Sequence, residues 1–96
     1  MIVDIEVSDI VISLGGRDEG KRFIVVGTQE DYSLLADGKL RKIESPKRKN
    51  NKHLKLEDKA GGPIAGKLIS GEKVTNSEIR RALAQYAADR GEKGGM

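Results

Sequence analysis

Short apolar runs separated by glycine-containing turns are the feature that most limits how this chain can fold. The runs Ile10–Leu14, Phe23–Val26 and Tyr32–Ala36 have the length of β-strands and are too short for stable helices. Phe23–Val26 is continuously apolar and β-branched, which is typical of a central strand buried on both faces. These runs predict a mainly β fold in the first half of the chain.

Two more strands are expected after these three. Asp37-Gly38 is a strong hairpin signal, because glycine and aspartate tolerate the left-handed conformation of tight turns, and Leu40–Ile43 would be the return strand. The polar segment 47–52 has no apolar anchor and is expected to be a loop, after which His53–Leu56 alternates again. Short strands at this spacing favour a barrel or a sandwich, and fewer than fifty residues favour a small five-stranded barrel.

The C-terminal part has a different pattern. Residues 60–74 are expected to form a linker whose short apolar patch, Ile64–Ile69, has no clear type. Thr75-Asn76-Ser77-Glu78 has the form of a capping box and predicts an amphipathic α-helix over 75–90, with Gly91 as its stop. The helix is too short to be stable alone, so its apolar face should dock on the barrel or on the patch. Residues 91–96 are expected to be a disordered tail.

Composition limits the classes of protein and site. Ninety-six residues make one small domain, and 36% hydrophobic residues support a modest core. The absence of cysteine excludes disulfides and cysteine-ligated metals, and fits a reducing, cytoplasmic setting. The N-terminus lacks the basic region of a signal peptide, and the apolar runs are too short to span a bilayer, so no membrane partner is expected.

Charge is distributed unevenly along the chain. Residues 1–38 hold three Lys/Arg and eight Asp/Glu, residues 39–55 hold eight Lys/Arg and one Glu, and residues 56–96 hold seven and six. The net charge of +3 therefore hides a concentrated basic segment over residues 39–55. Lysine and arginine in such a cluster neutralise phosphates and release counterions, which favours binding to nucleic acid. Charge alone does not distinguish RNA from DNA or from an acidic protein surface, and a solvated loop is the alternative.

The first turn adds further cations. Loops between consecutive strands of a small barrel alternate between its two ends, so Arg17 and Lys21 could lie near Lys39. Asp18 and Glu19 leave open the alternative that these cations pair within their own loop.

No catalytic or cofactor pattern is present. GGRDEG lacks the Gly-Lys-Ser/Thr ending of a phosphate-binding loop, and no helix is expected after it. His53 is the only histidine, so a metal site is not expected. A local hydrogen bond that fixes a turn is the favoured role for its ring, and contact with RNA is the alternative. No serine or carboxylate has an identifiable catalytic partner. A non-catalytic protein without cofactor, metal or small-molecule substrate is therefore expected.

The segments VISLGGRDEGKRFIVV and ADGKLR resemble a KOW motif, in which a glycine, here Gly16, follows the first strand. The wider stretch LLADGKLRKIESPKRKNNKHL is similar to KOW-type large-subunit ribosomal proteins of archaea and eukaryotes, and to short KOW-domain RNA-binding proteins of Gram-positive bacteria. The helix sequence TNSEIRRALAQY also looks like the tail of the bacterial group. Asp9 departs from the pattern, because many KOW motifs carry glycine there.

This resemblance implies an SH3-like barrel over residues 1–59 that binds ribosomal or other structured RNA in association with the ribosome or translation. Ribosomal proteins would be further partners. An alternative within the same family is a protein-interaction module that contacts the transcription or translation machinery. The residues expected to contact RNA are Arg17, Lys21, Arg22, Lys39, Arg41, Lys42, Lys47, Arg48, Lys49, Lys52, His53 and Lys55. Gly16, Gly20 and Gly38 are expected to be structural turn residues.

Overall fold

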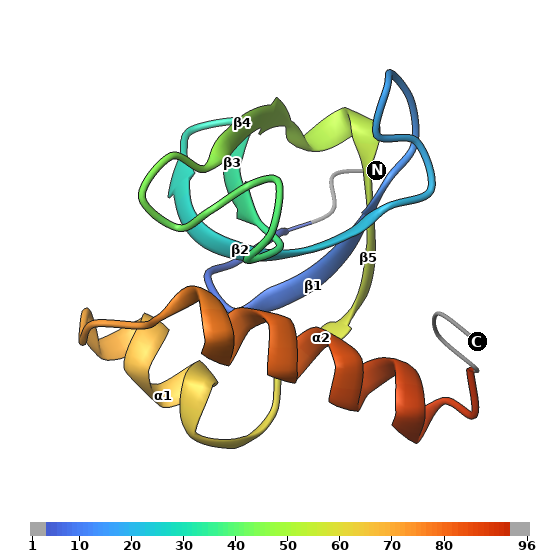
Figure 1. Cartoon of the computed structure of the whole chain (residues 1–96). Helices are drawn as coiled ribbons and strands as arrows, with labels where there is room; N and C mark the ends of the chain where they lie inside the picture. The colour runs from blue at the N-terminus through green and yellow to red at the C-terminus, as the bar shows by residue number, and fades with distance from the viewer. Residues whose placement is uncertain (1–3, 93–96) are drawn as a thin grey trace.

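The computed structural model describes residues 4–92 as a five-stranded antiparallel sheet with two helices packed against one of its faces (Figure 1). In chain order the elements are β1 (Asp9–Ser13), β2 (Arg22–Gln29), β3 (Tyr32–Ala36), β4 (Lys47–Asn50), the short 3₁₀-helix η1 (Asn51–His53), β5 (Leu54–Lys59), α1 (Gly62–Ser70) and α2 (Asn76–Asp89). The predicted five strands and C-terminal helix are confirmed in number and order, although the fourth strand lies elsewhere than expected and α1 is a second helix.

The strand order is β4-β3-β2-β1-β5, so β2 is central and β4 and β5 are the two edges. Within residues 4–92, every pairing is antiparallel and β4 does not pair with β5. The sheet is therefore not closed, and the predicted barrel is not confirmed. The two edge strands are nevertheless consecutive in sequence, since only η1 separates them. Register shifts in β1–β5 and in β2–β3 mark bulges, which bend the strands.

The sheet buries a different apolar cluster on each face. Val11, Phe23, Val25 and Leu35 lie on the face away from the helices, which is the concave face of the curled sheet in Figure 1, and Leu54 of β5 joins them. The opposite face carries a second cluster under the helices; its buried members are Ile10, Ile24, Ala36, Ala60, Ile64, Val74 and Ile79. Because alternate residues of β2 contribute to both clusters, the prediction that Phe23–Val26 is a strand buried on both faces is confirmed.

The helix predicted from the capping box is α2. Thr75 accepts a hydrogen bond from the Glu78 backbone amide, and the Glu78 side chain accepts one from the Thr75 amide. Ile79 is completely buried in the helix-side cluster, and the apolar patch Ile64–Ile69 lies within α1 beside it. The helix therefore docks on both the sheet and the patch, as expected. Since α1 occupies 62–70, most of the segment expected to be a linker is helical.

The hairpin predicted at Asp37-Gly38 is wrong, and so is the return strand Leu40–Ile43. Residues 37–46 form an irregular loop. The Asp37 carboxylate accepts hydrogen bonds from the backbone amides of Lys39 and Arg41, at 2.8 and 2.9 Å. Further along, the Ile43 amide donates to the Asn76 side chain of α2. These amides satisfy their hydrogen bonds with side chains, so the loop does not form a strand ladder.

The expectation that residues 47–52 form a loop is also wrong. Lys47–Asn50 is strand β4, which pairs with β3 in the register Leu35 to Lys47 and Tyr32 to Asn50. The strand contains no apolar residue, so the alternation on which strand prediction relies is invisible in it. The fifth strand is present where expected, although it runs over Leu54–Lys59 and His53 belongs to η1.

The ends of the described chain add two observations. The predicted disordered tail lies mainly in residues 93–96, outside the described residues, whereas Glu92 forms an ion pair with Arg22 at 3.0 Å. In residues 4–92, no helix combines the length and the apolar character needed to cross a membrane.

Removing the helix cap should measurably destabilise the protein. Thr75→Ala deletes the side-chain acceptor for the Glu78 amide and is expected to cost about 1 kcal/mol of unfolding free energy. Urea unfolding followed by circular dichroism measures this change. The matched control is Ser77→Ala, which removes an exposed hydroxyl two residues later. That hydroxyl accepts a hydrogen bond from Arg80 but caps no backbone amide, so its loss should cost less. Equal midpoints for the two variants would argue against a capping role for Thr75.

Candidate nucleic-acid interface

A buried aspartate organises one end of the sheet. Asp18 lies in the turn between β1 and β2, and only 7% of its surface is exposed. Its Oδ1 accepts hydrogen bonds from Ser13 Oγ at 2.8 Å and from Lys49 Nζ at 3.0 Å, while Lys47 Nζ lies 2.9 Å from Oδ2 as an ion pair. Lys49 Nζ also donates to the Gly15 carbonyl at 2.8 Å. One carboxylate therefore holds two lysines of the predicted basic segment.

The ionisation of Asp18 follows from this geometry. Burial raises the pKa of Asp18, but the two lysines and the serine hydroxyl outweigh burial and hold the pKa well below its usual range. The carboxylate is thus charged at neutral pH. Since strand residues alternate between faces, Lys47 and Lys49 point to the same side of β4 and reach it together.

The first turn and the loop 37–46 meet beside this cluster. A small cavity of about 140 Å³ is lined by Arg17 and Lys21 from the turn, Arg41 from the loop and Lys47 from β4. Asp37, which also lines it, uses its carboxylate to bind the loop's own amides. The loops therefore converge as the alternation of loop ends suggested, although Arg41 lines the cavity and Lys39 does not.

Most of the predicted RNA-contacting cations are exposed. Within residues 4–92, none of these exposed cations forms an ion pair with a carboxylate. The set consists of Arg17, Lys21, Lys39, Arg41, Lys42, Arg48, Lys52 and Lys55. His53 is exposed as well, and its backbone carbonyl accepts a hydrogen bond from the Leu14 amide at 2.9 Å. These cations are free to attract an external polyanion.

Arg48 faces the opposite side of β4 from the two half-buried lysines, Lys47 and Lys49. Its guanidinium carbon lies 3.9 Å from the centre of the Tyr32 ring, so the group is stacked on the aromatic face. Tyr32 is in β3 and pairs with Asn50, which makes Arg48 its diagonal neighbour across the two strands. Arg48 is exposed and Tyr32 is partly buried.

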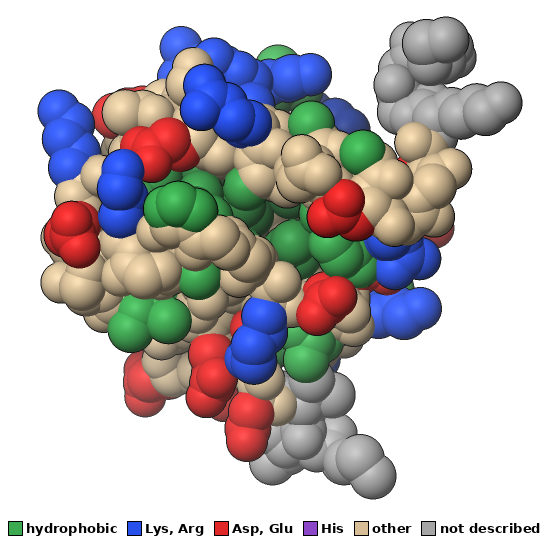
Figure 2. All heavy atoms as spheres, turned by 90° about the horizontal axis from the view of Figure 1, so that it is seen from below, with side chains coloured by type: hydrophobic (Ala, Val, Ile, Leu, Met, Phe, Trp, Pro, Cys, Tyr) green, Lys and Arg blue, Asp and Glu red, His purple; other side chains and the backbone are tan. Residues whose placement is uncertain are grey.

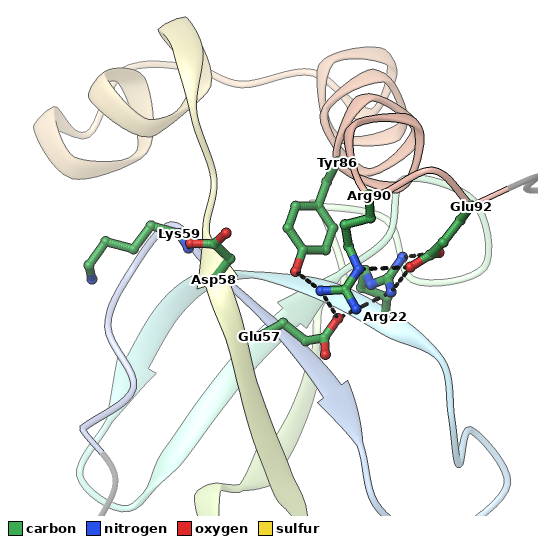
Figure 3. A network of polar contacts seen from close by, with 7 residues as sticks. All are labelled: Arg22, Glu57, Asp58, Lys59, Tyr86, Arg90 and Glu92. Atoms are coloured by element: carbon green, nitrogen blue, oxygen red, sulfur yellow. Dashed lines mark hydrogen bonds and ion pairs between the residues drawn. The ribbon is translucent and has the colours of Figure 1, made fainter.

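Arg22 lies in a different environment from the other predicted contacts. Its guanidinium donates to Glu92 at 3.0 Å and to Glu57 at 3.1 Å, and it lies over the Tyr86 ring (Figure 3). Arg90 joins the same network through Tyr86. Hydrogen bonding to Glu92 raises the pKa of Arg22 further. Arg22 thus links β2 to Glu92, just beyond the end of α2, and to Glu57 of β5. Because its guanidinium is used in these contacts within the fold, it lies outside the candidate interface.

The helix side of the molecule has a second concavity, separate from the small cavity beside Asp18. Figure 2 shows apolar side chains in a hollow on this face, with basic and acidic side chains around its rim. A groove of about 620 Å³ lies there between β5, the start of α1 and one side of α2. Ile10, Ile64, Ala82 and Tyr86 are among its apolar lining residues. Its charged lining has equal numbers of acidic and basic side chains; these are Asp58, Lys59, Glu78, Arg81, Asp89 and Arg90.

Three parts of the site could not be read from the sequence. The sequence suggests partners for Asp18 only within its own loop, whereas its lysine partners come from β4. The stacking of Arg48 on Tyr32 depends on the β3–β4 register, which an unrecognised strand cannot supply. The groove arises from the packing of α1, whose type the sequence left open.

The glycines expected in turns have positive φ angles, which are +83° at Gly16, +83° at Gly20 and +80° at Gly38. In residues 4–92, no group of three or more His, Cys, Asp or Glu side chains is arranged to hold a metal ion.

Comparison with known proteins adds no assignment, because neither a protein-family model nor a curated protein matches the sequence.

Proposed function

We propose that this protein is a non-catalytic RNA-binding protein that binds RNA phosphates through the exposed cations around β4, η1 and the two converging loops. The observation that carries the proposal is that these cations have no carboxylate partners within residues 4–92, although the chain contains fifteen acidic residues. A ribosome- or translation-associated role, in the cytoplasm, is the setting that the KOW resemblance implies. A rigid sheet edge would select RNA by shape as well as by charge.

We further propose that the curled sheet is a variant of the SH3-like barrel of KOW domains. Its concave face encloses a cluster to which β1, β2, β3 and β5 all contribute, which supports this relation. The edges β4 and β5 are joined directly by η1, so the sheet curls around that cluster without a ladder between them.

Salt dependence tests phosphate binding. With about five phosphate contacts, the logarithm of the affinity for a single-stranded RNA should fall with the logarithm of salt concentration with a slope near −3.5. In the double variant Arg17→Gln/Lys52→Gln, two contacts are lost, and the slope should become shallower by about 1.4. Fluorescence anisotropy with a labelled RNA, repeated over a range of salt concentrations, measures both slopes.

The matched control is Lys73→Gln/Arg81→Gln, which removes the same charges from exposed positions on the helix side. This variant should retain the wild-type slope. A flat salt dependence for the wild type, or equal effects of the two double variants, would contradict the proposal. Crosslinking in cells followed by sequencing of the bound RNA would then identify the target, and recovery of background RNA alone would count against a defined one.

The groove favours a second candidate function, a protein-interaction module that contacts the transcription or translation machinery. Its apolar floor and balanced charges suit a protein segment better than a polyanion. In this case the same protein partner should be recovered after RNase treatment, and Arg81→Gln, which removes a charge from the groove, should weaken its recovery. Loss of the partner after RNase treatment would instead favour RNA binding.

A further inference from the structure

The Arg48 guanidinium is held in one orientation by its contact with Tyr32. A distance of 3.9 Å between the guanidinium carbon and the ring centre is that of a direct stacking contact. One face of the planar group is thus covered by tyrosine, and the residue remains exposed, so the other face is turned to solvent. Aromatic rings and guanidinium planes on open sheet surfaces are the groups on which proteins stack unpaired bases of RNA.

We propose that Tyr32 and Arg48 form a stacking site for one unpaired base of the bound RNA, with the base lying on the outer face of the guanidinium. The inference rests on the proposed function and adds to it the kind of RNA preferred, namely a single-stranded or looped segment. A base inside a regular duplex is covered by its neighbours and could not reach this surface.

The surroundings of the pair suit a nucleotide. Asn50 lies opposite Tyr32 in the register, on the same face of the sheet. Its side-chain oxygen accepts a hydrogen bond from the Lys52 amide at 3.0 Å, which leaves its amide hydrogens available to donate to an acceptor on a base. Lys52 is exposed in η1, the next element, where its ammonium can reach a neighbouring phosphate.

Arg48 differs from its two strand neighbours in a way that supports a role outside the fold. Lys47 and Lys49 are held by the buried Asp18 carboxylate. Arg48 has no carboxylate partner within residues 4–92, and its side chain contacts an aromatic ring instead. A simple cross-strand pair would stabilise the sheet, but it would not favour unpaired bases over other polyanions, and this difference can be measured.

The test compares two ligands of equal charge, a short unstructured RNA and an inorganic polyphosphate. Arg48→Lys keeps the charge but removes the planar group, so it should weaken binding of the RNA about fivefold or more and leave polyphosphate binding unchanged. Tyr32→Leu should act in the same direction, whereas Tyr32→Phe should retain RNA affinity. Arg81→Lys is the matched control, because it makes the same chemical change at an exposed arginine of α2, outside the proposed RNA interface. Urea midpoints verify that each variant is folded.

The outcomes separate this inference from the function on which it rests. A selective loss of RNA affinity in Arg48→Lys, absent in Arg81→Lys, supports the stacking site. An equal loss for both ligands, or no loss for either, overturns the stacking site and leaves phosphate binding intact. A wild-type protein that shows no salt-dependent binding to the RNA overturns both proposals.

Discussion

Replacing Asp18 by asparagine is expected to lower the free energy of unfolding by about 2–4 kcal/mol. Asparagine has nearly the same shape and can still accept the hydrogen bond from Ser13, so the change removes mainly the negative charge. The ammonium groups of Lys47 and Lys49 would then face each other without their shared counter-ion. The side chain of Lys49 is only 12% exposed, so solvent cannot replace the carboxylate. Equilibrium urea unfolding measures the loss.

A second substitution tests this explanation. Lys49→Met removes the more buried ammonium but retains much of the side-chain volume, so Asp18→Asn/Lys49→Met should recover a large part of the stability lost in Asp18→Asn. Lys52→Met is the control, because Lys52 is exposed and makes no ion pair with Asp18. If Asp18→Asn/Lys52→Met recovers as much stability as Asp18→Asn/Lys49→Met does, the unpaired ammonium of Lys49 is not the cause of the loss in Asp18→Asn.

The same variant should change the pH dependence of stability. The pKa of Asp18 is lowered in the folded protein, so its contribution is fully present above the ordinary aspartate pKa of about 3.9 and disappears as the pH falls through the folded value. Asp18→Asn should therefore lose most stability near neutral pH and approach the wild type in strong acid. A constant difference at all pH values would contradict the ion-pair explanation.

Gly38→Ala is the second substitution with a large expected effect, about 3 kcal/mol of unfolding free energy. A methyl group on Gly38 would overlap the Asn76 carbonyl oxygen and lie 2.8 Å from Cγ of Arg80. The backbone φ of +80° adds strain for any residue other than glycine. Gly38 also accepts a 2.6 Å hydrogen bond from Arg80, so displacing the loop would weaken its attachment to α2. Thermal unfolding and the near-ultraviolet dichroism of the tyrosines report the change.

Gly20→Ala separates strain from overlap. Gly20 has φ of +83°, but a methyl group added there would have no atom within 4 Å. Gly20→Ala should therefore lower the free energy of unfolding only by the backbone strain, about 1 kcal/mol. If both alanine variants cost the same, the close approach of α2 to the loop is not what requires glycine at position 38.

The sequence predicted those elements that have a continuous apolar run or a periodic apolar pattern. The strands at Phe23–Val26 and Tyr32–Ala36 and the helix that begins after Thr75 are present, because local pattern and tertiary burial agree in them. The hairpin prediction failed because the Asp37 side chain binds the loop amides, which is a local interaction that residue pattern does not reveal. Strand β4 was missed because its inward residues are lysines that an aspartate far away in sequence neutralises.

The basic segment was predicted as one functional unit, but the structure divides it among distinct tasks. Lys47 and Lys49 serve the fold through Asp18, and Arg48 is stacked on Tyr32. The exposed cations of the loops and η1 remain available for an external partner. Charge counting cannot make this division, since it depends on which face of β4 each side chain occupies and on the register with β3.

The position of β4 at an edge of the sheet has a consequence for self-association. An unpaired edge strand exposes backbone donors and acceptors that can pair with the edge of another molecule. In this protein, two such edges would bring two copies of Lys47-Arg48-Lys49 together, and the repulsion between their charges opposes that pairing. The cations of β4 thus oppose edge-to-edge association of two copies, whether or not RNA is bound.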